Sequence, residues 1–305
     1  RSMLVPALID IIYQHQNYRI FILSSLITSM FGVILLLSVW GKHQQLGLRE
    51  AFLLTTSTWI TIAIFSSIPF YMSNLSLSIT DAFFESMSGI TTTGATVINN
   101  LELQSKGILI WRALLQWLGG IGIIVMAVAV LPMLQVGGMQ LFRLESSDNA
   151  DKILPRATQI AGSIVLLYLI ITFACALSYN IAGMGLFDSL AHALTTISTG
   201  GYSTHSDSFG FFDNPKIEYF AVLFMIIGSL PFVLYLQFVR GKPGNLFLDS
   251  QVITFIVILI SAIILCTIYV HINIGIHYGE ALRRAAFNVT SILTGTGYVL
   301  SLIHI

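Results

Sequence analysis

Long apolar stretches alternate with short polar ones along this chain of 305 residues. A helix needs about 20 apolar residues to cross the hydrocarbon core of a bilayer. Stretches of that length cover residues 18–40, 50–72, 107–134, 157–179, 216–239 and 251–271, and residues 1–13 read as part of a further helix. The pattern therefore predicts an all-α polytopic membrane protein.

A finer pattern recurs three times between these stretches, at residues 81–97, 188–204 and 284–299. Each copy has an apolar segment too short to span a bilayer, followed by a run of small hydroxyl and glycine residues. Aligned without gaps, the copies superpose Gly94, Gly201 and Gly297, which lie 107 and 96 residues apart. Repeats can arrange equivalent backbone segments around one axis. We therefore expect repeated helix–pore loop–helix units around a single pore.

The short segments are interpreted as re-entrant pore helices. Non-helical backbone at membrane depth is tolerated only where it is buried in protein or lines a water-filled path. The carboxyl end of a short helix carries partial negative charge, which stabilises a cation in a low-dielectric cavity. Asp81 and Asp188 are expected to cap the first two short helices. The third copy has Arg283 and Arg284 instead, so Glu280 is the expected cap of a longer helix.

The loop that follows each short helix is the candidate ion-binding segment, because backbone carbonyl oxygens can replace the water shell of a cation. Glycine at the aligned position lets the backbone approach the ion and adopt conformations closed to other residues. We call residues 91–95 loop 1, residues 198–202 loop 2 and residues 294–298 loop 3. The candidate filter residues are Thr91, Thr92, Thr93, Gly94, Ala95, Ser198, Thr199, Gly200, Gly201, Tyr202, Thr294, Gly295, Thr296, Gly297 and Tyr298.

Composition and charge support a membrane role and narrow the function. Hydrophobic residues make up 55% of the chain and charged residues 9%, with a mean hydropathy of +0.85. The formal net charge is zero, so no nucleic-acid partner is expected. The cysteines, Cys175 and Cys266, lie inside apolar runs and indicate no disulfide framework.

The basic residues predict the orientation in the membrane. Seven of the 14 Lys and Arg residues lie in loops that alternation puts on one side, against about four on the other, so the first side is assigned as cytoplasmic: Lys42, Arg49, Arg143, Lys152, Arg156, Arg240 and Lys242. The opposite linkers hold Arg19, Lys106 and Lys216, and Arg112 lies just inside a span. The loops then open to the outside.

A coupled transporter and an intramembrane enzyme are the two other function classes for a chain of this kind. A coupled transporter usually carries ionisable residues at mid-membrane, and only Arg112 comes near that description, although coupling through backbone and hydroxyl groups stays open. For an intramembrane enzyme, the sequence has neither a His-Glu-x-x-His motif nor paired membrane aspartates. His192 and Glu85, at matching places on the first two short helices, are interpreted as packing or hydrogen-bonding residues.

Several segments resemble the Trk/Ktr/HKT superfamily of potassium transporters, and most closely its TrkH-type membrane subunit. The resemblance covers nearly the whole chain and is carried by residues 81–98, 115–133, 137–143 and 197–206. It implies four span–pore–span repeats with four-fold pseudosymmetry around a K⁺ pathway, preceded by an extra helix pair. It also associates Gly94 with potassium and a serine there with sodium.

The resemblance further implies a homodimer in the inner (cytoplasmic) membrane and a cytoplasmic nucleotide-binding regulatory subunit of TrkA or KtrA type, near Arg143, Lys152, Arg156, Arg240 and Lys242. Potassium is the expected transported ion, with no bound cofactor. Passive uptake through the loops is the expected function, and Na⁺- or H⁺-coupled symport is the alternative.

The resemblance divides the chain into an N-terminal helix pair at residues 1–40, with a truncated first helix, a first repeat at 41–140, a second at 141–245 and an incomplete third at 246–305. The fourth repeat is missing, so we expect a C-terminally truncated member. Residues 300–305 form an apolar tail where a polar turn is expected, and we interpret this tail as non-native.

Overall fold

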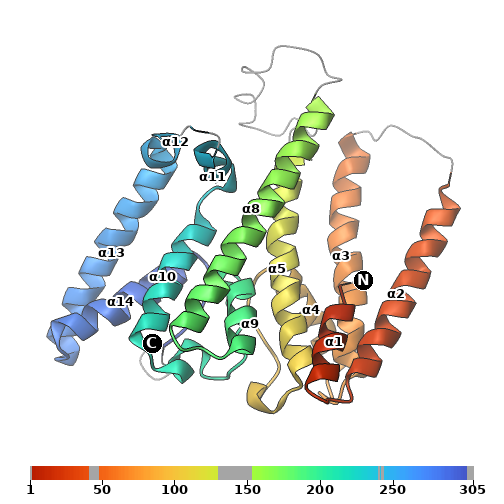
Figure 1. The fold of residues 1–305 in the computed structure, drawn as a ribbon, viewed down its shortest axis with the longest axis horizontal. Coiled ribbons are helices and arrows are strands. Elements are labelled where there is room, and N and C mark those ends of the chain that lie inside the picture. Colours follow the sequence, from red (N-terminus) through yellow and green to blue (C-terminus); the bar gives the residue numbers. More distant parts are fainter. Residues whose placement is uncertain (1, 41–47, 130–152, 240, 242–243, 301–305) are drawn as a thin grey trace.

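The computed structural model describes residues 2–40, 48–129, 153–239, 241 and 244–300. All regular structure in these residues is helical (Figure 1). The helices are α1 Leu4–Ile12, α2 Tyr18–Ser38, α3 Leu48–Met72, α4 Ile79–Ile90, α5 Lys106–Ala129, α8 Ile153–Ile181, α9 Leu186–Ile197, α10 Pro215–Ser229, α11 Phe232–Val239, α12 Gly244–Leu248, α13 Ser250–Ile274 and α14 Tyr278–Leu293, with short 3₁₀ turns η1 Leu101–Leu103 and η3 Ser208–Phe212.

Five of these helices are long and apolar enough to cross a membrane: α2, α3, α5, α8 and α13. They run side by side in Figure 1, with α2 at one edge and α13 at the other. Over an 18-residue stretch of each helix, 56% of the residues of α5 are buried within the chain, against at most 22% in each of the other four. The chain is thus a polytopic helical membrane protein with α5 in its interior.

The short helices α4, α9 and α14 lie in the lower half of the molecule in Figure 1. Each packs against the long helix that precedes it, which is α3, α8 or α13. In addition, α9 contacts α5 and α14 contacts α10. The first unit comprises α3, α4 and α5, and the second comprises α8, α9 and α10. Each later short helix therefore contacts the last helix of the unit before it.

One predicted span is not a single helix. The sequence predicts a span over residues 216–239, but α10 and α11 meet at an angle of 91°. Proline disfavours helical backbone at the residue before it, and Leu230 is extended ahead of Pro231, with ψ 151°. The Tyr235 hydroxyl donates to the Ile227 carbonyl at 2.9 Å, which partly satisfies the broken turn. The expectation of one continuous helix over these residues was wrong for this reason.

The N-terminal helix α1 is tied to α5 by a buried carboxylate. Asp10 has no exposed surface, and its Oδ1 accepts from the Gly107 backbone N–H at 2.6 Å. This amide belongs to the first turn of α5, where N–H groups have no partner within the helix. Asp10 therefore fixes α1 at the start of the buried central helix.

Several predictions fall on residues outside those described. They concern Lys42, Arg143, Lys152, Arg240, Lys242, the end of the span predicted at residues 107–134, and residues 301–305 of the tail.

Candidate functional site at the three loops

The three loops leave their short helices with the same backbone conformation. The first loop residue is near φ −80° in each case, at Thr91, Ser198 and Thr294. The second residue of each loop is left-handed, with φ 57° at Thr92, 50° at Thr199 and 75° at Gly295. The fourth is left-handed as well, with φ 80° at Gly94, 76° at Gly201 and 83° at Gly297. The sequence repeat is thus also a conformational repeat.

Hydrogen bonds at the ends of α4 and α9 explain the first left-handed residue. In loop 1 the Thr93 N–H donates to the Ser88 carbonyl at 2.9 Å, and the Thr92 N–H donates to the Gly89 carbonyl at 3.0 Å. These two bonds define a Schellman motif, which requires a left-handed residue after the helix. Loop 2 repeats both bonds, from Gly200 to Thr195 and from Thr199 to Thr196.

The third loop keeps one of these bonds and shifts the other. The Gly295 N–H donates to the Ile292 carbonyl at 3.0 Å, as in the other loops, but Gly297 rather than Thr296 donates to the Ser291 carbonyl, at 3.2 Å. All three helices therefore stop at a loop in which the second and fourth residues have positive φ and the first and third do not. This alternation allows successive carbonyls to share one side of a loop, as a carbonyl-lined ion site requires.

Neighbouring loops touch through the aligned glycines. A methyl group added at Gly94 would lie 2.3 Å from the carbonyl oxygen of Gly200, and one added at Gly201 would lie 1.8 Å from that of Thr296. Gly200 and Thr296 occupy the same position in loops 2 and 3. A methyl group at Gly297 would meet nothing within 4 Å among the described residues. The loops are therefore stacked in series, from loop 1 through loop 2 to loop 3.

The last residue of each of loops 2 and 3 is a buried tyrosine that reaches back to the preceding short helix. The Tyr202 hydroxyl donates to the carbonyl of Glu85 on α4 at 3.1 Å. The Tyr298 hydroxyl donates to the carbonyl of His192 on α9 at 3.2 Å. Glu85 and His192 are matching residues of the repeat, so the same link joins loop 2 to the first unit and loop 3 to the second. Loop 1 has the small residue Ala95 at this place.

Serine hydroxyls on the short helices hold the last carbonyls of loops 1 and 3 by hydrogen bonds. Ser88 and Ser291, at matching positions of α4 and α14, donate to the carbonyls of Ala95 and Tyr298 at 2.6 and 2.8 Å. Burial differs between the loops. In loop 2, Ser198, Gly200 and Tyr202 are buried and no residue is exposed, whereas Thr91, Thr93 and Ala95 are exposed in loop 1, and loop 3 alternates exposed Gly295 and Gly297 with buried Thr296 and Tyr298. The middle loop is therefore covered by its neighbours on both sides, and the outer two are not.

Gln116 on α5 contacts loop 2 directly, and sequence reasoning missed it. Its Nε2 donates to the Gly200 carbonyl at 2.6 Å, and its Oε1 accepts from the Tyr202 N–H at 3.0 Å. The side chain has no exposed surface. The available signal was a single amide within an apolar span, which needs a partner when it is buried.

Glu85 and Arg112 form a buried ion pair between α4 and α5. Arg112 Nε lies 2.7 Å from Glu85 Oε1, and the two side chains are 1% and 0% exposed. Glu85 also accepts from Thr96 and from the Val97 N–H. The interpretation of Glu85 as a hydrogen-bonding residue is confirmed. That of His192 is confirmed too, since its Nε2 lies 3.0 Å from the Ser203 hydroxyl.

The predicted caps of the short helices have different outcomes. Asp81 caps α4 in a reciprocal box with Ser78, as expected. Asp188 does not cap α9, because its Oδ1 accepts from the Thr204 hydroxyl at 2.7 Å instead. His277 caps α14, so the assignment of Glu280 was wrong, and Glu280 pairs with Arg284 at 2.6 Å. The longer third helix is confirmed, at 16 residues against 12 for α4 and α9.

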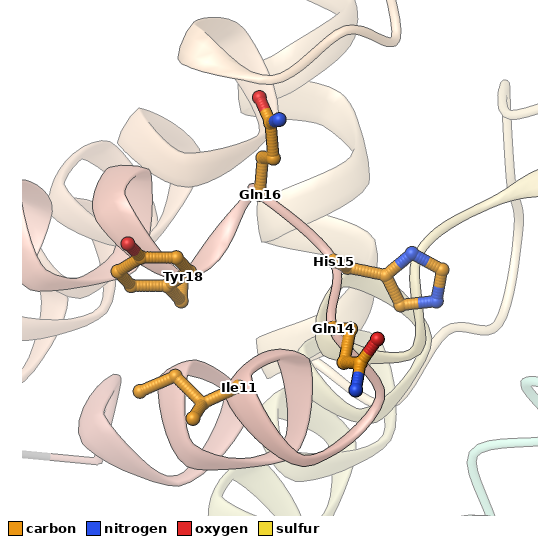
Figure 2. Close-up of a pocket in the computed structure, with 5 residues that line it drawn as sticks. All are labelled: Ile11, Gln14, His15, Gln16 and Tyr18. Carbon is orange, nitrogen blue, oxygen red and sulfur yellow. The ribbon is translucent and has the colours of Figure 1, made fainter.

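Two surface cavities of the described residues lie away from the loops. The cavity shown in Figure 2, about 310 Å³ in volume, is lined by the turn between α1 and α2, and a second of about 280 Å³ lies beside residues 97–99. Figure 2 places the His15 ring on one side of the first cavity and Ile11 and Tyr18 on the other. Within the part of the chain that the structure describes, no three His, Cys, Asp or Glu side chains are grouped so as to hold a metal ion. The three loops are therefore the candidate site.

Comparison with known proteins gives a consistent result. The model of the family TrkH, described as a cation transport protein, matches residues 17–301. The Trk system potassium uptake protein TrkI of Halomonas elongata is 40% identical over 297 residues, which are 97% of this chain and 60% of the relative. TrkH of Escherichia coli is 36% identical over 302 residues, again 97% of this chain and 62% of the relative.

The fold agrees with a solved structure. The crystal structure of the potassium transporter TrkH from Vibrio parahaemolyticus superposes with a TM-score of 0.89 at 34% sequence identity, covering 98% of this chain and 62% of that one. The chain thus spans about three fifths of the length of these relatives. Since the family match extends over nearly all of its residues, the chain belongs to the TrkH family of cation transport proteins.

Proposed function

We propose that this chain provides three of four units that surround a potassium pathway, and that loops 1, 2 and 3 form three quarters of its selectivity filter. The filter residues are those of the three loops, from Thr91 to Ala95, Ser198 to Tyr202 and Thr294 to Tyr298. The observation that carries the proposal is the repeated left-handed backbone at the second and fourth loop positions. Such backbone presents carbonyl oxygens in place of the water shell of an ion.

The order of contacts between loops supports a ring with one unit absent. Loop 1 touches loop 2 at Gly94, and loop 2 touches loop 3 at Gly201, whereas Gly297 has no neighbour among the described residues. A fourth loop would place its carbonyl on Gly297 and its own glycine against Thr93. This arrangement supports the proposed pseudo-four-fold symmetry. The proposed divisions are a helix pair at residues 1–40 and repeats at 41–140, 141–245 and 246–305.

The names of the relatives support K⁺ as the transported ion and uptake as the direction of transport. The matched proteins of Halomonas elongata and Escherichia coli are named potassium uptake proteins of a Trk system. We extend this to K⁺ uptake across the bacterial inner membrane, by a homodimer that binds a nucleotide-sensing cytoplasmic subunit of TrkA or KtrA type. Co-purification of the full-length protein that carries this chain with such a subunit tests the partner.

Flux measurements test the main proposal. The full-length protein, reconstituted in liposomes, should take up Rb⁺ as a K⁺ surrogate in preference to Na⁺. Gly94→Ser should lower that preference, because a side chain at Gly94 meets the Gly200 carbonyl and a φ of 80°. Gly162→Ala is the matched control, since nothing lies within 4 Å of its added methyl group. An unchanged ion preference in Gly94→Ser would refute the filter role of loop 1.

The same liposomes separate passive uptake from coupled symport. Passive uptake follows the electrochemical gradient of the permeant ion alone. A flux that requires an imposed Na⁺ or H⁺ gradient would establish the alternative, a cation-coupled symporter, and would leave the filter assignment to the Gly94→Ser result.

A further inference from the structure

The buried pair Glu85–Arg112 has no evident role as a stabiliser of the fold. Removing two charges from water costs several kcal/mol for each ion, and apolar residues of similar volume often replace such pairs without loss of stability. Both side chains are nevertheless almost completely buried, at 0% and 1% exposed. What distinguishes the pair is the backbone that each partner holds.

Glu85 holds the segment that leaves loop 1. Both of its carboxylate oxygens lie 3.0 Å from the Thr96 hydroxyl, and Oε2 accepts from the Val97 N–H at 3.0 Å. Thr96 directly follows the last residue of loop 1. Bonds of this kind to an ionised carboxylate are about twice as strong as neutral ones, so Glu85 fixes the outer end of loop 1 relative to α4.

Arg112 holds the matching segment of loop 2. Its Nη1 donates to the carbonyl of Ser203, the residue after loop 2, at 3.1 Å. Its guanidinium also lies over the ring of Tyr202, 4.0 Å from the centroid. A planar guanidinium donates in a fixed fork to two acceptors while its flat face stacks on an aromatic ring, whereas a lysine ammonium is a compact point charge with no planar face.

The ion pair therefore links the outer ends of two neighbouring loops. A second link runs parallel to it, because the Tyr202 hydroxyl donates to the Ala95 carbonyl at 3.1 Å as well as to the Glu85 carbonyl. If Arg112 were displaced, the Tyr202 ring would lose its stacking partner. The loop 1 carbonyl of Ala95, to which the Tyr202 hydroxyl donates, would then no longer be held in place. Carbonyl positions decide which ion is bound without its water shell.

The junction between loops 2 and 3 is built without this charge. His192 stands in place of Glu85. When Gly228 is aligned with Gly119, Arg112 is matched by Ala221, which is buried and apolar. Gly119 and Gly228 both lie against the last carbonyl of a short helix, that of Ile90 or Ile197, which supports this alignment. Among the described residues, a charged link at this position therefore joins loops 1 and 2 and does not recur between loops 2 and 3, where the ion pair between the units is Glu218 with Arg283, from α10 to α14.

We propose that Glu85 and Arg112 are positioning residues that set ion selectivity by holding loops 1 and 2 in register. The assignment rests on the proposed function of the loops as a potassium filter. It predicts that loss of the pair changes which ion passes before it changes whether the protein folds.

The test uses the double variant Glu85→Gln with Arg112→Met in the full-length protein that carries this chain. It leaves no unpaired buried charge, so the membrane domain should still fold, whereas the links to Ser203 and Tyr202 are lost. The preference for Rb⁺ over Na⁺ in liposome flux should fall about tenfold, as expected for loss of a charge-assisted hydrogen bond. Thermal unfolding in detergent should shift little.

The matched control is the pair Glu280 and Arg284 on α14, which has the same chemistry and a similar N–O distance of 2.6 Å, but joins residues one turn apart on a single helix and is 39% and 42% exposed. Glu280→Gln with Arg284→Met should leave the ion preference unchanged. Arg112→Lys is a milder second variant that keeps the charge, and it should lose part of the preference because it cannot replace both links. It keeps the test decisive if the double variant does not fold.

An unchanged ion preference in a folded double variant, or in Arg112→Lys if the double variant does not fold, would overturn the proposal, as would an equal loss in the control pair. A wild-type protein without preference for Rb⁺ would instead overturn the proposed filter function, and this assignment with it.

Discussion

The α-carbon of Gly201 packs directly against the carbonyl oxygen of Thr296, which leaves no room for a side chain: an added methyl group would lie 1.8 Å from that oxygen. Favourable contacts between non-bonded heavy atoms begin near 3.5 Å. The spacing between loops 2 and 3 is therefore set by the absence of a side chain at Gly201. Gly94 sets the spacing between loops 1 and 2 in the same way.

Gly201→Ala should therefore disrupt the site more than Gly94→Ala. The overlap of the added methyl group is deeper at Gly201, 1.8 Å against 2.3 Å, and both residues have positive φ. The preference for Rb⁺ over Na⁺ in liposomes is expected to fall in both variants, and further in Gly201→Ala. If the two variants behaved like Gly162→Ala, an exposed helical position with open space around it, the close loop contact would not matter for ion selection.

Thr92→Gly should be tolerated, although Thr92 is a candidate filter residue. A β-branched residue is rarely left-handed, yet Thr92 has φ 57°, and loop 3 has Gly295 at the matching place. Among the described residues its hydroxyl makes no hydrogen bond. Glycine removes about 1–2 kcal/mol of backbone strain, so the melting temperature in detergent should not fall and ion preference should persist. A loss of preference would show that the Thr92 hydroxyl contacts the ion.

The repeat made much of the fold predictable from sequence. Apolar length located the long helices, and the spacing of Gly94, Gly201 and Gly297 located three loops with the same backbone conformation. The bend at Pro231 was missed because residues 216–239 are predominantly apolar on average. A window that long averages over the single proline that breaks the helix.

Contacts between units were much harder to predict. Gln116 touches Gly200 across 84 positions of sequence, and Arg112 touches Ser203 across 91. A lone polar residue in an apolar span indicates that it has a partner but does not identify the partner. The function of Asp188 was also misjudged, because a carboxylate in the first turn of a helix is favourable whether or not it caps that helix.

Asp10→Ala should destabilise the packing of α1 against α5. The Asp10 carboxylate accepts from the Gly107 N–H in a fully buried setting, and an unpaired buried donor costs about 1–3 kcal/mol. Asp10→Asn keeps an acceptor oxygen and should cost less. Thermal unfolding of the detergent-solubilised protein measures the difference, with Asp207→Ala, at an exposed residue, as the control. Equal melting temperatures for Asp10→Ala and the control would contradict the role of this contact.

Gln116 offers the sharpest test of how α5 supports loop 2, because its Nε2 donates one hydrogen bond to the loop and its Oε1 accepts another. Gln116→Leu removes both the donor to the Gly200 carbonyl and the acceptor for the Tyr202 N–H. Gln116→Glu keeps an acceptor and removes only the donor, while placing negative charge beside a carbonyl oxygen.

Both Gln116 variants should lower the preference for Rb⁺ over Na⁺, since each leaves the Gly200 carbonyl without its partner. Gln116→Leu should also lower the melting temperature, because the buried Tyr202 N–H is left unpaired at a cost of about 1–3 kcal/mol. Gln159→Leu, at an exposed position of α8, is the matched control. Normal ion preference in Gln116→Glu would show that the Gly200 carbonyl does not need its bond to α5, and that α5 supports loop 2 through Tyr202 alone.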